Sequence, residues 1–218
     1  MTRIALIHAL VHSVEPINRE MASAWPEAVR MNLLDDSLSA DLAQKAGKGV
    51  SGLDLAMHQR FETLAAYAEG TGADAILFTC SAFGPCIEAA AARRPHMPVL
   101  KPNEAMVIDA VALGGRIGLI ASFAPTLASM PAEFPAGTDL VTQLADGAMD
   151  ALNQGDGALH DALVLEAAWQ LRKQGAKVIA LAQFSMARAR ARVEHELGML
   201  VLTTPGSAVQ ALRRRLGA

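Results

Sequence analysis

The chain has 218 residues, which is enough for one large domain or for two domains of about 100 residues each. Hydrophobic residues make up 52% and charged residues 19% of the sequence, a balance typical of a globular protein with a sizeable core. The formal net charge of −3 at pH 7 has the wrong sign for binding through phosphate attraction, so we expect no nucleic-acid partner.

Short apolar runs begin the chain and predict its first strands. Residues 4–7 form the first run, and a weaker one follows at residues 29–34. A helix is predicted next, because apolar residues recur at spacings of three and four along one helix face: Val50, Leu53, Met57, Phe61 and Leu64. Gly72 ends this helix, and residues 75–78 predict a buried strand after it.

The same alternation of strand and helix continues to the end of the chain. Further strands are predicted at residues 99–100, 117–120, 178–181 and 200–202. Further helices are predicted at residues 84–93, 103–113, 158–174, 186–197 and 205–216. Continuous apolar strands that alternate with helices indicate an α/β fold, in which helices cover both faces of a parallel sheet.

The sequence also contains a weak internal repeat. Residues 3–7, 73–78 and 97–100 are echoed by residues 116–120, 176–181 and 199–202, at offsets of 113 (116 − 3), 103 (176 − 73) and 102 (199 − 97). We therefore predict two pseudo-symmetric, doubly wound halves, each with a short parallel sheet flanked by helices. The predicted first half comprises residues 1–101 and 205–218, and the second comprises residues 102–204.

The segments that follow the strands are the expected place for a site. Open parallel sheets bind their ligands beyond the carboxyl ends of the strands. We expect two such halves to share an active-site cleft between them. The walls of this cleft are predicted from residues 8–13, 79–84, 121–126 and 182–185.

Cys80 carries the strongest local signal for chemistry. It follows the predicted strand at residues 75–78, and Gly84 and Pro85 then begin a helix. Backbone N–H groups of such a turn bind a carboxylate and lower a thiol pKa toward neutrality, where the thiol both removes and returns a proton. The alternative is a buried structural cysteine, which is the interpretation we favour for Cys86.

The segment Thr79-Cys80-Ser81-Ala82-Phe83-Gly84 resembles the first cysteine motif of the Asp/Glu/hydantoin racemase superfamily, which includes arylmalonate decarboxylase and maleate isomerase. Residues 101–106 and 116–126 resemble other segments of this superfamily, and residues 178–187 resemble its second motif. The resemblance spans nearly the whole chain. It implies a cofactor-independent, racemase-type or isomerase-type enzyme that acts at the α-carbon of a small carboxylate, such as an amino acid or a hydantoin.

Racemases of this superfamily place one cysteine on each side of the substrate, and the resemblance makes Cys80 the first of the two. The repeat offset of 103 puts the second at position 183, where this chain has Gln183. An amide is not an acid–base group near neutral pH, and Ser185 nearby is a poor base without assistance. A two-base mechanism is therefore doubtful. A single-cysteine decarboxylase, a cis–trans isomerase of a small dicarboxylate and a non-catalytic carboxylate-binding protein stay open.

The candidate site combines these two residues with a set of substrate-binding groups. Cys80 and Gln183 are the catalytic candidates, and for Gln183 the alternative is a polar residue that caps a strand end. The substrate-binding candidates are backbone N–H groups or side chains of His8, Ser13, Ser81, Ala82, Phe83, Thr126 and Ser185. For His8, a hydrogen-bonded core histidine is the alternative. No third ligand accompanies His8 and His12, so we expect no metal.

Composition also sets expectations for compartment and partners. No apolar run approaches the roughly 20 residues that span a bilayer, and two cysteines give no disulfide framework. We expect a cytoplasmic protein with no membrane partner and no cofactor, whose partner is a small-molecule carboxylate substrate. A symmetric homodimer is a candidate oligomeric state.

Overall fold

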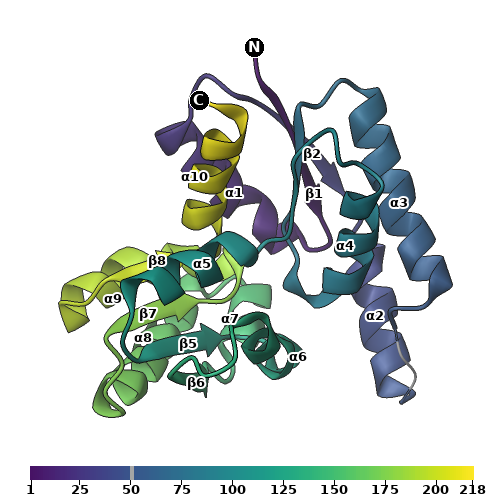
Figure 1. Cartoon of the computed structure of the whole chain (residues 1–218). Helices are drawn as coiled ribbons and strands as arrows, with labels where there is room; N and C mark the ends of the chain where they lie inside the picture. Colours follow the sequence, from purple (N-terminus) through teal and green to yellow (C-terminus); the bar gives the residue numbers. More distant parts are fainter. Residues whose placement is uncertain (50–51) are drawn as a thin grey trace. The chain divides into compact units, whose positions relative to one another are not determined.

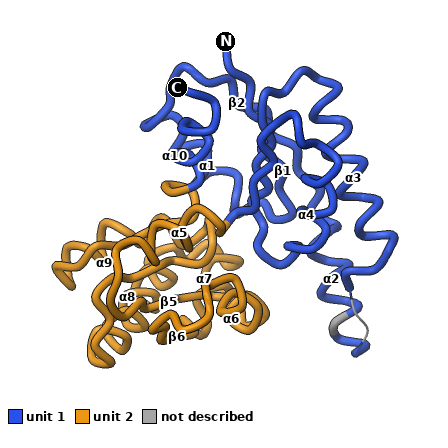
Figure 2. Tube along the Cα trace, viewed as in Figure 1, with its two compact units in different colours: residues 1–102, 208–218 blue, residues 103–207 orange. Residues whose placement is uncertain are grey.

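The computed structural model describes residues 1–49 and 52–218 and divides into two compact units. Figure 2 shows unit 1, formed by Met1–Pro102 and Ala208–Ala218, and unit 2, formed by Asn103–Ser207. Each unit contains a parallel four-stranded sheet flanked by helices. The predicted α/β class with two similar halves is confirmed. Among the described residues, no helix is both long and apolar enough to cross a membrane.

The sheet of unit 1 has the strand order β2-β1-β3-β4. Its strands are β1 (Arg3–His8), β2 (Val29–Leu34), β3 (Ala75–Phe78) and β4 (Val99–Leu100). One face packs against α2 (Ser37–Gly47), α3 (Leu55–Gly70) and α4 (Gly84–Ala92). Alternate side chains of a strand point to the same face, so Ile7 of β1 and Phe78 of β3 enter this core together with Phe61 of α3.

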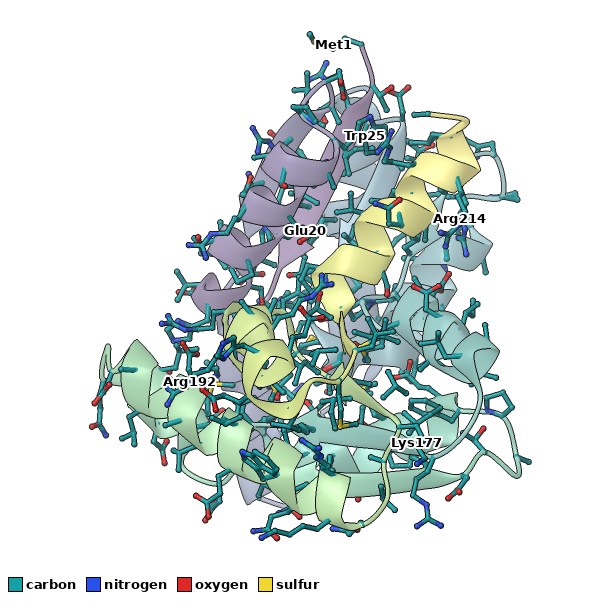
Figure 3. The ribbon with its side chains drawn as sticks, turned by 90° about the vertical axis from the view of Figure 1, so that its left-hand side faces the viewer. Met1, Glu20, Trp25, Lys177, Arg192 and Arg214 are labelled. Carbon is teal, nitrogen blue, oxygen red and sulfur yellow. The ribbon has the colours of Figure 1, made fainter. Side chains whose placement is uncertain are left out.

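The opposite face of this sheet is covered by the two ends of the chain. Figures 1 and 3 show α10 (Thr204–Leu216) beside α1 (Val14–Ala24), on the side of β1 away from α3. Arg213 Nη1 donates a hydrogen bond of 2.7 Å to the carbonyl oxygen of Ala24, the last residue of α1. Trp25, labelled in Figure 3, is buried at the end of this helix. These contacts tie the carboxyl-terminal helix to unit 1.

Unit 2 repeats the arrangement, with the strand order β6-β5-β7-β8. Its strands are β5 (Ile117–Ala121), β6 (Leu140–Leu144), β7 (Val178–Leu181) and β8 (Val201–Thr203). Helices α8 (Gly157–Lys173) and α9 (Arg190–Leu197) pack on one face, and α5 (Glu104–Leu113), α6 (Ala124–Ser129) and the 3₁₀ segment Met130–Glu133 pack on the other. The short helix α7 (Ala148–Asn153) precedes α8.

The registers of the two sheets match position for position. Ile7 pairs with Phe78 in unit 1, and Ile120 pairs with Leu181 in unit 2. These pairs differ by the offsets of 113 (120 − 7) and 103 (181 − 78) that the repeat predicts. The repeat therefore identifies equivalent positions in the two units, including Cys80 and Gln183, each two residues after its pair.

Several elements differ from the sequence-based predictions. The helix predicted from Val50 begins at Leu55, because the Asp54 side chain caps it by accepting a hydrogen bond from the N–H of Met57 at 3.0 Å. Leu53 lies before the helix, and Val50 lies outside the described residues. The predicted helix at residues 186–197 is the 3₁₀ segment Phe184–Ala189 followed by α9. The apolar pattern did not predict β6, α1, α2, α6 or α7.

Candidate functional site

Cys80 lies at the turn that leaves β3, an inner strand of the first sheet. Its backbone is extended, with φ −121° and ψ 121°, and the 3₁₀ segment Ser81–Phe83 and then α4 follow. Phe83 anchors this turn in the core, where its ring centroid lies 4.9 Å from that of Phe61. The Phe83 side chain is thereby unavailable to a ligand, so of the predicted binding groups at this residue only its backbone N–H remains.

The Cys80 thiol is half-buried and has two hydrogen-bonding neighbours. Burial raises its pKa above the usual value, while hydrogen bonds from the backbone N–H of Ala82 and from the Ser39 side chain act in the opposite direction. The expectation that the turn lowers the thiol pKa to neutrality is therefore wrong for this structure, because the cost of burying a thiolate outweighs both hydrogen bonds. Cys80 is protonated near neutral pH and is suited to donate a proton.

Ser39 was not among the predicted site residues. It lies on α2 and is half-buried. Leu38 and Leu42 show the four-residue spacing of a helix, but no sequence signal relates Ser39 to Cys80, 41 residues further along the chain. Only the fold brings Ser39 to the thiol.

A narrow apolar hollow lies beneath the Cys80 turn, lined by Ile7, His8, Ala9, Leu38, Phe61, Phe78 and Cys80. It is too narrow to hold a water molecule. The hollow therefore does not hold a substrate in this structure.

His8 is fully buried at the end of β1, and both of its ring nitrogens have partners. Nδ1 lies 2.8 Å from Thr79 Oγ1, and Nε2 lies 3.0 Å from Asn32 Oδ1. Burial lowers the pKa of His8, against a smaller opposing effect of the Asn32 hydrogen bond, so the ring is neutral. This structure fits the hydrogen-bonded core histidine and leaves no ring nitrogen for a substrate.

Gln183 occupies in unit 2 the position that Cys80 has in unit 1. It follows β7 with an extended backbone, φ −133° and ψ 145°, and precedes a 3₁₀ segment. Its Oε1 accepts hydrogen bonds from the backbone N–H of Ser122 at 2.6 Å and from Ser122 Oγ at 3.0 Å. Because a backbone nitrogen only donates, the atom facing it must be the amide oxygen. The amide NH₂ group therefore points away from the N–H of Ser122, and it has no acceptor among the residues of unit 2.

The remaining candidates are buried polar residues at the carboxyl edges of the two sheets. Ser13 is 5% exposed just before α1, Ser185 is 6% exposed in the segment after Gln183, and Thr126 is 2% exposed in the first turn of α6. The N-cap position of α6 is held by Phe123, so Thr126 does not cap this helix. Ser81 and Ala82 are half-buried beside Cys80.

Cys86 is separate from this chemistry. It is 1% exposed in the core cluster of unit 1, as the packing interpretation predicts. Burial, with a smaller contribution from the negative charge of Asp54, raises its pKa to about 11. Cys80 is therefore the more exposed of the two thiols. No group of three or more His, Cys, Asp or Glu residues in the described parts of the chain is arranged to hold a metal ion.

The family model for Asp/Glu/hydantoin racemases matches residues 11–212. A search of curated proteins finds no significant match. Among solved structures, the chain is similar to Picrophilus torridus aspartate racemase, with a TM-score of 0.76 and 12% identity over 100% of this chain and 95% of that one.

Two further solved structures have the same fold. Allantoin racemase from Klebsiella pneumoniae aligns with a TM-score of 0.70 and 18% identity over 100% of this chain and 88% of that one. A variant of arylmalonate decarboxylase aligns with a TM-score of 0.66 and 16% identity over 99% and 94%. The fold is thus found in enzymes named for racemisation and in one named for decarboxylation.

Proposed function

Because the chain belongs to the Asp/Glu/hydantoin racemase family, we propose that it is a cofactor-independent enzyme that transfers a proton at the carbon next to the carboxylate of a small acid. Cys80 is the acid–base group. The observation that carries the proposal is a half-buried thiol where an inner strand ends, hydrogen-bonded by the N–H of Ala82 and the side chain of Ser39.

The protonation state of Cys80 favours one reaction over the others. A thiol that holds its proton at neutral pH is ready to protonate a carbanion, and is less suited to abstract a proton first. In a decarboxylation, the C–C bond to one carboxylate breaks, carbon dioxide leaves, and the electron pair stays on the α-carbon as an enediolate. The S–H bond then breaks as the new C–H bond forms, and water returns a proton to the thiolate.

Ala82 and Ser39 assist at the stage when Cys80 carries a negative charge. Their hydrogen bonds act on the thiolate more strongly than on the thiol, because bonds to an ionised acceptor are the stronger ones. They therefore stabilise the product of proton donation. Backbone N–H groups of the same turn, at Ser81 and Phe83, are proposed to bind the substrate carboxylate.

Gln183 is proposed to act as a fixed hydrogen-bond donor. Its amide oxygen is engaged by Ser122, so only its NH₂ group is offered to a ligand. Two N–H donors suit a carboxylate or the oxygens of an enediolate. An amide supplies no second base, which is what a two-base racemase requires. A single-thiol decarboxylase is therefore the form of the proposal that these two residues favour.

Racemisation is the second candidate, and the family match supports it. A racemase with this chain's residues needs a base other than Gln183 on the second face. A cis–trans isomerase is the third, in which the Cys80 thiolate adds to a double bond and leaves after rotation. That route requires the thiol to lose its proton first, against the raised pKa.

The test is turnover by the wild-type chain, Cys80→Ala and the matched control Cys86→Ala, with amino acids, hydantoins, substituted malonates and a cis-unsaturated dicarboxylate in D₂O. The proposal expects a reaction that Cys86→Ala retains and Cys80→Ala loses. A decarboxylase releases carbon dioxide without exchanging deuterium into its substrate, whereas a racemase exchanges deuterium into both enantiomers. Wild-type activity in Cys80→Ala, or tight binding without any turnover, would overturn the proposal.

A further inference from the structure

His8 connects the ends of three strands beside the Cys80 turn. Its own strand is β1, its Nε2 contacts Asn32 near the end of β2, and its Nδ1 contacts Thr79, the residue after β3. The backbone adds to these links, because the N–H of Thr79 donates to the carbonyl oxygen of Ile7 at 3.0 Å. The N–H of Asp35 donates to the carbonyl oxygen of His8 at 3.0 Å. One buried imidazole thus joins the neighbouring strands at the edge where Cys80 lies.

The hydrogen bonds around His8 determine which ring nitrogen carries the proton. Asn18 Nδ2 lies 2.7 Å from the carbonyl oxygen of Val14, which only accepts, so this atom must be a nitrogen. The same Nδ2 lies 2.7 Å from Asn32 Oδ1, which must then be the acceptor. His8 Nε2, 3.0 Å from that oxygen, is therefore the N–H. In the neutral ring, Nδ1 is left to accept the hydroxyl hydrogen of Thr79 at 2.8 Å.

Unit 2 has no counterpart of this bridge. The sheet registers put Ala121 at the position of His8 and Ala182 at the position of Thr79. Both alanines are buried in an apolar cluster of unit 2. The polar link therefore occurs in the unit whose turn carries a thiol, and its place is taken by two methyl groups in the unit whose turn carries an amide.

A buried polar link is costly unless every group in it has a partner, and two alanines show that this fold forms without it. The side chain of His8 points to the face of the sheet opposite Ile7 and Phe78, where it meets Asn32 and Thr79, and it is fully buried. Both of its ring nitrogens are engaged by protein groups, so its effect on chemistry has to pass through Thr79, the partner that adjoins Cys80. Thr79 is bonded covalently to Cys80, and its own side chain is 3% exposed.

We propose that His8 is a positioning residue for Cys80. By its hydrogen bond to Thr79, His8 keeps the Cys80 sulfur within reach of the N–H of Ala82 and of the Ser39 side chain. This inference rests on the proposed role of Cys80. When the Thr79 hydroxyl is removed, the backbone entering Cys80 is held less firmly. The two hydrogen bonds that favour the thiolate then weaken, and thiolate formation shifts to higher pH.

The test compares Thr79→Val, which removes the hydroxyl at nearly constant shape, with Thr79→Ser, which keeps it. Both are made in the full-length chain with Cys86→Ala, so that Cys80 is the one thiol. The rate of alkylation by iodoacetamide is measured from neutral to alkaline pH. We expect Thr79→Val to lower the alkylation rate at neutral pH by about threefold, as for one lost hydrogen bond. The rise of the rate with pH should move to higher pH. Thr79→Ser is expected to restore the profile.

Thermal unfolding of each variant shows whether it is folded. An unchanged alkylation profile in a folded Thr79→Val chain, or a shifted profile that Thr79→Ser does not restore, would overturn the proposal. If Thr79→Val does not fold, the ¹⁵N shifts of the His8 ring in the parent chain decide the matter. The proposal requires a proton on Nε2 and an acceptor at Nδ1, and a proton on Nδ1 contradicts it. Neither readout uses a substrate, so a failure of the proposed enzymatic activity is distinguishable from a failure of this inference.

Discussion

The turn after β3 and the turn after β7 are equivalent by sheet register but carry different chemistry. Both leave an inner strand through an extended residue and enter a 3₁₀ segment. In unit 1 that residue is Cys80, with hydrogen bonds from Ala82 and Ser39. In unit 2 it is Gln183, with hydrogen bonds from Ser122. The backbone of the fold specifies where a group is presented, and the residues around the turn specify what that group can do.

The same contrast extends to the strand ends next to each turn. Beside Cys80, the ends of β1 and β3 are joined by the polar pair His8 and Thr79. Beside Gln183, the equivalent positions are Ala121 and Ala182. The proposed proton-transfer group, Cys80, thus has polar neighbours at the strand ends, and the proposed hydrogen-bond donor, Gln183, has apolar ones. Four changes test this comparison, from the largest expected effect to the smallest.

Replacement of Cys80 by alanine should lower the rate more than replacement of Gln183. Cys80→Ala removes the acid–base group, and we expect kcat to fall by about 10²- to 10⁴-fold. Initial rates on the substrate identified from the panel measure the effect. Cys86→Ala is the control, because Cys86 is buried in the core and contacts no substrate in this account.

Gln183→Ala removes two N–H donors but no proton-transfer group. Loss of hydrogen bonds to a charged substrate should lower kcat/KM by about 10- to 100-fold, with binding affected along with the chemical step. Steady-state kinetics give the two parameters separately. Gln183→Cys sharpens the comparison, because it supplies a second thiol at the equivalent position and should introduce deuterium exchange into both enantiomers of a chiral substrate.

A structural difference between the two sheets is tested at Gly118, which is equivalent to Ala5. A Cβ at Gly118 would lie 3.0 Å from the side chains of Ile179 and Leu171 and 3.1 Å from that of Ala176. Gly118→Ala should therefore lower the free energy of unfolding by about 1–3 kcal/mol through overpacking. Chemical denaturation measures it. An unchanged free energy of unfolding would contradict the close packing of α8 on β5 at Gly118.

The smallest expected effect concerns pH and His8. Burial lowers the folded-state pKa of His8 below its ordinary value, so protonation favours the unfolded chain. Its contribution to stability is full above about pH 6.5, where the unfolded residue is neutral, and is lost as the pH falls through the folded pKa. His8→Gln should flatten the dependence of unfolding free energy on pH between neutral and mildly acidic conditions. An equally steep dependence in the variant would contradict the assignment.

Much of the fold could be predicted from the sequence, because its strands are short continuous apolar runs. Residues 29–34, 75–78 and 178–181 are strands with the predicted bounds. The edge strand β6 was missed, since it is half-buried on both faces and shows neither a continuous apolar run nor a clear alternation. Helices α1 and α2 were not predicted, although Val14, Ile17 and Met21 in α1 and Leu38 and Leu42 in α2 recur at helical spacings of three and four.

The positions of Cys80 and Gln183 were predictable because they follow strands, and strand ends define the sheet edge. Their surroundings were not. Ser39 reaches the thiol from a helix whose packing against β3 the sequence does not specify, and the direction of the thiol pKa shift depends on burial that only packing determines. Similarly, the orientation of the Gln183 amide depends on the backbone N–H of Ser122, 61 residues away in the sequence.

The most direct measurement of the central claim is the stereochemistry of a single turnover in D₂O. A prochiral substituted malonate is incubated with the wild-type chain, and the product acid is analysed for deuterium and for enantiomeric composition. One protonated thiol and one amide donor predict a single α-deuterated enantiomer, which Cys86→Ala also forms and Cys80→Ala does not. A racemic α-deuterated product that continues to exchange its α-hydrogen would show a base on each face and would contradict the account.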